Sequence, residues 1–286
     1  MMATPDPLYV AARRVLLDAL DALSVHRRAM VVVGAQAIYL RTEPSAGGIA
    51  PYTTDGDFVL DPDQLGDEPL LEDALREGGF RLLPSGGGLQ PGLWTRRTSL
   101  GSREIEVEVD LLVPAAWSRG GPSPRGARLG VHGKRAARLT RGLEAALVDH
   151  GPLTIEALEP EDSRVIEVAV AGCAALLIAK VHKLRDRAAG RADRLHDKDA
   201  ADVVRLLQAT PTAELVPVLA GLRRHERAGE VTVQGLTELR HLFGARGAEG
   251  VRMAVRSLEG AMPAEQVMAI CGTAVSDLLD GLQSLG

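Results

Sequence analysis

The chain has 286 residues, of which 45% are hydrophobic and 25% are charged, and these ordinary values for a globular protein exclude bulk disorder. The formal net charge of −5 excludes a protein that binds nucleic acid with its whole surface, and two cysteines exclude a disulfide framework. The sequence shows no apolar run long enough to cross a bilayer and no secretory signal pattern, so we expect a cytoplasmic protein without a membrane partner.

The first elements predicted are a helix, a buried strand and a tight turn. Apolar residues recur at helical spacing over 7–28, and the β-branched run at 29–35 ends at a glycine. A helix is expected from Gln36 onward. Such a turn presents free backbone N–H groups at the positive end of a helix, where phosphate can bind, although any strand-to-helix turn shares this pattern.

The motif TTDGDFVL, at 53–60, offers two interpretations. If it is a strand, Asp55 and Asp57 place two carboxylates on one face, which a divalent metal ion would stabilise. Gly56 then provides room for a close approach. The alternative is a polar turn, for which Asp-Gly is a strong signal, and a turn needs no metal ion.

A hairpin is predicted further along, after an expected helix at 61–79 and a surface loop at 85–92. Its strands, 93–100 and 103–114, flank Gly101-Ser102. Asp110 lies where the second strand becomes apolar, so a lone acid there is costly. We interpret Asp110 as a third carboxylate beside the pair on the TTDGDFVL motif, because three acids from two strands can hold two divalent ions.

A basic segment follows the hairpin. Residues 111–142 contain no acid and seven cations, which are Arg119, Arg125, Arg128, Lys134, Arg135, Arg138 and Arg141. This distribution is typical either of a surface that binds RNA phosphates or of a solvated, arginine-rich loop.

The character of the sequence changes at Cys173, after which every segment has helical periodicity. The helices expected are 173–190, 196–209, 212–229, 234–260 and 263–285. We therefore predict an α+β protein. A domain at 1–172, with a small mixed or antiparallel sheet flanked by helices, would be followed by a helical domain at 173–286 packed on it.

Charged side chains mark the first two of these helices. Lys180 falls on or beside the apolar face and needs an anion there, unless its chain extends past the core to solvent. Lys183 and Arg187 continue a basic stripe along the same helix. Asp199 and Asp202 share one edge of the next helix, where an acid near the N-terminus is also favoured by the helix dipole.

Taken together, these motifs resemble the polymerase-β-type nucleotidyltransferases, and within them the AbiEii/MenT group of toxin-antitoxin systems. The resemblance covers about residues 30–207. It rests on a glycine turn before a helix, a Thr-Asp-x-Asp strand, a later strand acid, a Lys-x6-Arg helix and a Lys-Asp-x-x-Asp helix.

The resemblance implies a role for each matching residue. Asp55, Asp57 and Asp110 would bind catalytic Mg²⁺ or Mn²⁺, and Asp110 would also activate the acceptor hydroxyl. Lys180 would be a catalytic lysine that contacts phosphate. The backbone N–H groups of Gly34, Ala35 and Gln36 would bind the triphosphate, and Lys183 and Arg187 would also bind the nucleotide. Asp199 would be the late acid of the family, with Asp202 as the competing assignment. The family usually has Gly-Gly or Gly-Ser at the turn, whereas this chain has Gly-Ala and lacks the hydroxyl.

The activity implied is transfer of a nucleoside monophosphate from an NTP to an acceptor hydroxyl, at the 3′ end of tRNA, by a toxin with a cognate antitoxin. The RNA surface would include Arg125, Arg128, Lys134, Arg135 and Arg138. One alternative is a nucleotidyltransferase that modifies a small molecule of the aminoglycoside type. Another is a relative that binds without catalysis.

Overall fold

The computed structural model describes residues 5–42, 51–85, 88–118, 126–188 and 197–285. The chain divides into two compact units. Unit 1 contains residues 1–40, 50–140 and 150–171, and unit 2 contains residues 41–49, 141–149 and 172–286. The fold is α+β, as predicted, with a mixed sheet in unit 1 and helices in unit 2.

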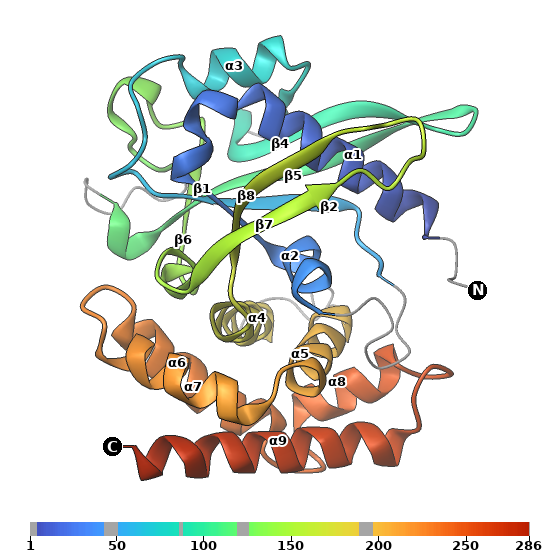
Figure 1. Cartoon of the computed structure of the whole chain (residues 1–286), viewed down its shortest axis with the longest axis vertical. Coiled ribbons are helices and arrows are strands. Elements are labelled where there is room, and N and C mark those ends of the chain that lie inside the picture. The colour runs from blue at the N-terminus through green and yellow to red at the C-terminus, as the bar shows by residue number, and fades with distance from the viewer. Residues whose placement is uncertain (1–4, 43–50, 86–87, 119–125, 189–196, 286) are drawn as a thin grey trace. The chain divides into compact units, whose positions relative to one another are not determined.

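Unit 1 is built on an eight-stranded sheet (Figure 1). Its strands are β1 (Met30–Val33), β2 (Asp55–Leu60), β3 (Arg81–Ser85), β4 (Gly88–Leu100), β5 (Arg103–Pro114), β6 (Arg138–Thr140), β7 (His150–Glu156) and β8 (Val165–Ala171). The order is β3-β4-β5-β2-β1-β8-β7, and β6 pairs with β5. The β2–β5, β5–β6 and β1–β8 pairs are parallel and the others are antiparallel.

The predicted hairpin at Gly101-Ser102 is confirmed. β4 and β5 pair antiparallel up to Leu100 and Arg103, and Gly101 has a φ of 60°, which favours glycine in the turn. The expected loop at 85–92 is wrong in its second part, because β4 begins at Gly88. There the backbone pairs with the end of β3 and forms a second hairpin.

The strand interpretation of TTDGDFVL is confirmed, because β2 pairs with β1 on one side and β5 on the other. Helix α1 (Pro7–Ala22) packs across β2, β4 and β5. A Cβ at Gly56 would lie 3.0 Å from Leu16 Cδ1 of that helix. The room that Gly56 provides is therefore occupied by α1, and the side chains of Asp55 and Asp57 extend from the opposite face.

Two predicted helices of unit 1 are shorter than expected. α1 is capped by Asp6, which accepts a hydrogen bond from Leu8 N at 2.8 Å, and it ends at Ala22 before a short 3₁₀ helix, η1 (Ser24–Ala29). The helix expected at 61–79 is confined to α3 (Leu71–Glu77). Pro69 disfavours helical backbone in the residue before it, which is consistent with the late start of α3.

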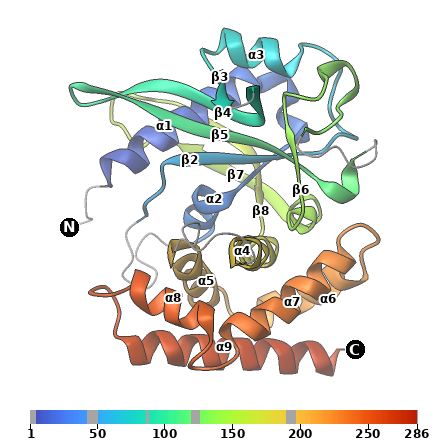
Figure 2. The ribbon, with the colours of Figure 1, turned by 180° about the vertical axis from the view of Figure 1, so that it is seen from behind.

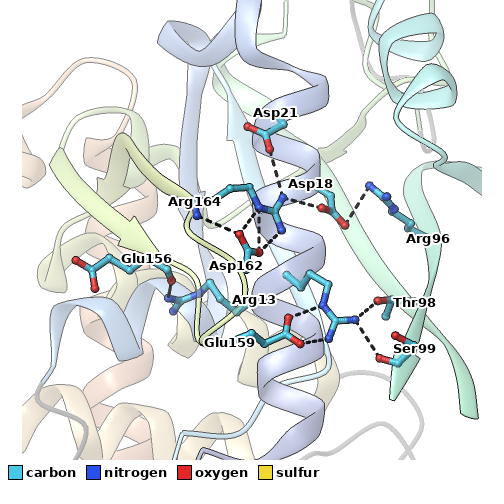
Figure 3. A network of polar contacts seen from close by, with 11 residues as sticks. Arg13, Asp18, Asp21, Arg96, Thr98, Ser99, Glu156, Glu159, Asp162 and Arg164 are labelled. Atoms are coloured by element: carbon cyan, nitrogen blue, oxygen red, sulfur yellow. Dashed lines mark hydrogen bonds and ion pairs between the residues drawn. The ribbon is translucent and has the colours of Figure 1, made fainter. Parts of the chain in front are cut away.

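Ion pairs and hydrogen bonds hold α1 to the β4–β5 hairpin and to the turn between β7 and β8 (Figure 3). Arg14 binds Glu159 and donates to Thr98 Oγ1 at 2.6 Å. Asp18 forms ion pairs with Arg96 at 3.0 Å and with Arg164 at 2.7 Å. Each of these contacts joins α1 to a segment distant in sequence, so the network fixes the helix on the sheet.

Unit 2 consists of helices, with α4 in contact with α5, α6 and α7. Its helices are α4 (Cys173–Ala188), α5 (Asp197–Ala209), α6 (Thr212–Arg224), α7 (Gly229–Phe243), α8 (Glu249–Ser257) and α9 (Ala264–Ser284). α9 runs alongside α6, α7 and α8 (Figure 2). The prediction of a single helix at 234–260 is wrong, because α7 ends at Phe243 and α8 begins at Glu249. The N–H of Gly244 donates to Arg240 O at the end of α7. Among the described residues, no helix is long and apolar enough to span a membrane.

Candidate functional site

The predicted carboxylates of unit 1 lie on one face of two neighbouring strands. β2 and β5 pair in parallel, and the register places Asp57 opposite Asp110 and Asp55 opposite Glu108. Residues paired across parallel strands share a face, so Asp55, Asp57 and Asp110 point the same way. The three predicted acids therefore lie on one face of the sheet, and each is half-buried.

The carboxyl group of Asp110 has a strongly raised pKa. Burial and the negative charge of Asp57 raise its pKa to about 7, with smaller contributions from Asp55 and Glu108, although the charge of Arg138 lowers it. The side chain is 17% exposed, so solvent screens the repulsion only in part. Near neutral pH, Asp110 can therefore either accept or release a proton.

Arg138 contacts Asp110 directly. The pairing of β6 with β5 places Arg138 beside Leu112, and its Nη2 donates to Asp110 Oδ2 at 2.6 Å. The other carboxylate oxygen, Oδ1, is buried and has no hydrogen-bond partner among the described residues. Sequence analysis assigned Arg138 to the RNA surface and gave no signal for this contact, because the two residues are 28 positions apart.

The glycine turn lies against Asp57. Gly34 begins α2 (Gly34–Arg41) with a φ of 71°, a conformation that favours glycine. A Cβ on Gly34 would lie 1.9 Å from Asp57 Oδ2, so a larger residue cannot occupy this position unless the carboxylate moves. The turn expected to bind phosphate and the expected metal ligand Asp57 are thus packed together.

Gln36 has a structural role in this turn. Its side chain is buried, and Nε2 donates to Ala12 O at 3.1 Å and to Asp55 O at 3.0 Å. Arg13 Nε donates to Gln36 Oε1 at 2.9 Å. Gln36 therefore ties α1 to the start of β2. Ala35, which is also buried, keeps its backbone N–H at the start of α2.

Thr53 was missed by sequence reasoning. It is fully buried, and its hydroxyl donates to Asp55 Oδ1, so it orients the first carboxylate of the motif. A threonine two residues before an aspartate is too common a pattern to predict this contact. The preference of threonine hydroxyls for nearby acceptors is the physical signal that could have indicated it.

The donor set of this face suits a hard divalent cation. Carboxylate oxygens are the ligands that Mg²⁺ and Mn²⁺ prefer, and Oδ1 of Asp110, for which the described part of the chain provides no hydrogen-bond partner, is a candidate ligand beside Asp57. Within the described ranges, no group of three or more His, Cys, Asp or Glu side chains is gathered closely enough to hold a metal ion. The metal assignment of Asp55, Asp57 and Asp110 stays a prediction.

The charged residues predicted after Cys173 form a second cluster, within unit 2. Lys180 is 5% exposed, and its ammonium donates to Asp199 Oδ1 and to Asp202 Oδ2, both at 2.7 Å. Burial lowers the pKa of Lys180, but Asp202 and Asp199 outweigh this effect and raise it above its ordinary value. The anions that Lys180 needs are thus supplied by α5, and its side chain does not extend to solvent.

Lys183 and Arg187 surround the same carboxylate. Lys183 Nζ lies 3.6 Å from Asp199 Oδ1, and Arg187 binds Asp199 Oδ2. Burial raises the pKa of Asp199, but the charges of Lys180, Lys183 and Arg187 lower it below its ordinary value. These two cations are 41% and 26% exposed, so they are more accessible than Lys180. That this cluster acts at one centre with the carboxylates of unit 1 stays a prediction.

The cations of the basic segment have different surroundings. Arg128 and Lys134 are exposed. Arg135 donates twice to Glu72, at 3.1 and 3.0 Å, and Arg141 donates to Glu230 at 2.6 Å. Arg119 and Arg125 lie outside the described residues. The RNA-binding assignment of this segment stays a prediction.

Comparisons with known proteins provide a likeness to solved structures. A scan against protein-family models finds no match, and a search of curated proteins finds none either. Among solved structures, the chain is similar to an antigenic nucleotidyltransferase-like protein from Paracoccidioides brasiliensis, with 15% identity and a TM-score of 0.41. The match covers 81% of this chain and 94% of that one. A likeness of this degree carries no argument about function.

Proposed function

We propose that this chain is a metal-dependent nucleotidyltransferase that transfers a nucleoside monophosphate from an NTP to an acceptor hydroxyl. The observation that carries the proposal is the pairing of Asp57 with Asp110 on parallel strands, with the Gly34 turn packed against Asp57. Two facing carboxylates next to a helix N-terminus offer ligands for a cation and backbone donors for a phosphate in one place.

The residues of unit 1 divide the chemistry between them. Asp55, Asp57 and Asp110 would hold Mg²⁺ or Mn²⁺, which when bound supplies a counter-charge for the phosphates. The acceptor oxygen forms a bond to the α-phosphorus, the bond from that phosphorus to the bridging oxygen breaks, and pyrophosphate leaves. Asp110, which faces Asp57 across the two strands, would accept the hydroxyl proton. The N–H groups at Gly34 and Ala35 bind phosphate oxygens.

The cations of unit 2 have separate roles in the proposal. Lys183 and Arg187, which are partly exposed, would bind phosphate oxygens of the nucleotide. Lys180 already donates to two carboxylates and is almost fully buried. Its role is therefore to orient Asp199 and Asp202, and these acids in turn keep it charged.

The acceptor we propose is the 3′ end of tRNA, and the biological role is that of a toxin with a cognate antitoxin. The sequence motifs that resemble the AbiEii/MenT group support this choice. The exposed Arg128 and Lys134, on a segment with no acid from 111 to 142, provide positive charge for an RNA backbone.

The test is a transfer assay on the full chain. Purified protein is incubated with Mg²⁺ or Mn²⁺, each of the four labelled NTPs in turn, and total tRNA, with Asp57→Asn as the matched variant. The expected result is label on RNA with the wild type, loss of the label with Asp57→Asn, and loss with a chelator. Absence of transfer from every NTP to tRNA and to small hydroxylated acceptors would overturn the proposal.

A parallel arm separates the two acceptor classes. The same NTPs are offered with an aminoglycoside in place of tRNA, and both reactions are repeated at increasing salt concentration. Transfer to tRNA should fall steeply with salt, because the protein exchanges counterions with the RNA backbone. Transfer to the small molecule alone, with little salt dependence, would retain the nucleotidyltransferase assignment and overturn the tRNA assignment.

A further inference from the structure

The two oxygens of Asp110 have different surroundings. Oδ2 accepts a hydrogen bond from Arg138 Nη2 at 2.6 Å, whereas Oδ1 is buried without a hydrogen-bond partner among the described residues. Arg138 is held in place by its backbone, since β6 pairs with β5 and Gly126 forms a bridge to Arg138. One oxygen thus accepts from a side chain whose backbone is held between two segments, and the other has no hydrogen-bond partner among the described residues.

This asymmetry has a physical consequence for a ligand. A carboxylate fixed through one oxygen cannot rotate freely about its last torsion, so the second oxygen keeps a set direction. Asp57 faces Asp110 across the two strands, and the charge of Asp57 acts strongly on Asp110. In metal sites, carboxylate ligands are themselves hydrogen-bonded by outer residues that set their orientation. The contact of Arg138 with Oδ2 is of this kind.

We propose that Arg138 is a positioning residue that makes Asp110 a one-oxygen metal ligand, with Oδ1 directed to the cation. This inference rests on the proposed function, because it requires that the carboxylate face bind a divalent ion. It assigns Arg138 to the reaction centre instead of the RNA surface. The opposite role, in which Arg138 competes with the metal for Asp110, is a distinct outcome of the test.

The test measures metal affinity in the absence of nucleotide and RNA. Mn²⁺ is titrated into the wild type, Arg138→Gln, Arg138→Lys and Arg81→Gln, with free Mn²⁺ followed by electron paramagnetic resonance. Arg81 is the matched control, because it binds Glu106, another acid of β5, from a neighbouring segment. We expect Arg138→Gln to weaken Mn²⁺ binding by roughly 10- to 100-fold. Arg138→Lys should recover part of the affinity, and Arg81→Gln should bind as the wild type does.

The outcomes separate this inference from the proposed function. If the wild type binds Mn²⁺, Asp57→Asn does not, and Arg138→Gln binds as tightly as the wild type or more tightly, only the positioning role is overturned. If the wild type itself does not bind Mn²⁺, the metal-dependent function and the positioning role are both overturned. Thermal melting of each variant checks its folding, and if Arg138→Gln does not fold, the affinity of Arg138→Lys decides the question.

Discussion

Unit 1 contains two groups of acidic side chains that differ in how their charge is balanced. In the network of Figure 3, Asp18, Glu159 and Asp162 are each hydrogen-bonded or ion-paired to an arginine. Arg164 lowers the pKa of Asp162 by donating to it. On the face of β2 and β5, burial and the neighbouring acids raise the pKa of Asp110 to about 7 despite Arg138.

The difference shows how a structural cluster can be distinguished from a candidate site. Charges matched by rigid donors hold α1 on the sheet and leave little capacity for a ligand. Acids that face one another make the folded chain less stable unless a cation joins them, and such incompletely balanced groups are typical of functional sites. Mutations in the two groups should therefore affect activity and stability in opposite ways.

The largest expected effect comes from Asp57→Asn compared with Asp162→Asn. Asp57→Asn removes a proposed metal ligand and should lower the transfer rate by at least about 10³-fold, the equivalent of several kcal/mol of charge stabilisation. It should also raise the melting temperature of the metal-free chain, because the repulsion with Asp110 is relieved. Transfer assays and thermal melting measure the two effects.

Asp162→Asn should show the reverse. It loses its negative charge and the two hydrogen bonds that Arg164 donates to Asp162 Oδ2 at 2.6 and 3.0 Å, so the melting temperature should fall while transfer is retained. Equal loss of activity in both variants, or a lower melting temperature for Asp57→Asn, would contradict the distinction between the two groups.

The next largest effect concerns Lys180, which belongs to a balanced cluster that is also buried. Lys180→Met leaves Asp199 and Asp202 without the ammonium to which both are bonded at 2.7 Å. Breaking a buried pair in this way costs about 3–5 kcal/mol. The free energy of unfolding in urea measures the loss. Lys183→Met, at a half-exposed position 3.6 Å from Asp199, is the control and should lose far less.

The pH dependence of stability tests the unbalanced face. The pKa of Asp110 is raised from its ordinary value of 3.8 to about 7 in the folded chain. Its stabilising contribution is therefore complete below the ordinary value and is lost as pH rises through about 7. Without metal, the wild type should lose up to about 4 kcal/mol relative to Asp110→Asn over this range. Unfolding curves at several pH values measure the difference, and parallel curves for the two proteins would contradict it.

The local patterns of the sequence predicted the strands of the site well. Alternation over 103–114 and the β-branched run before Gly34 are short-range signals, and β5 and β1 follow them. That Asp55 and Asp57 share a face could be predicted from one strand, because alternate residues of a strand point the same way. That Asp110 lies beside Asp57 followed from the cost of an acid in an apolar strand, and the parallel register bears it out.

The contacts that complete each cluster could not be predicted in this way. Arg138 reaches Asp110 because β6 adds to β5 in parallel, and nothing in the three residues of β6 indicates that pairing. The side chain of Gln36, whose backbone N–H is the predicted phosphate donor, is buried because the α1 backbone and β2 supply its partners. Lys180 was expected to bind a phosphate, but α5 provides two carboxylates that a linear pattern does not place beside it. Such side-chain contacts depend on tertiary packing.

The smallest expected effect comes from the balanced network itself. Arg164→Gln removes contacts to Asp162, Asp18 and Asp21, and because Arg164 is 28% exposed, the loss should be about 1 kcal/mol. The loss should decrease at high salt, which screens the pairs. Arg246→Gln, which breaks a more exposed pair with Glu265, is the control and should change the unfolding free energy by less. Transfer activity should be unchanged in both variants. A large loss of activity in Arg164→Gln would show that the network serves the site as well as the fold.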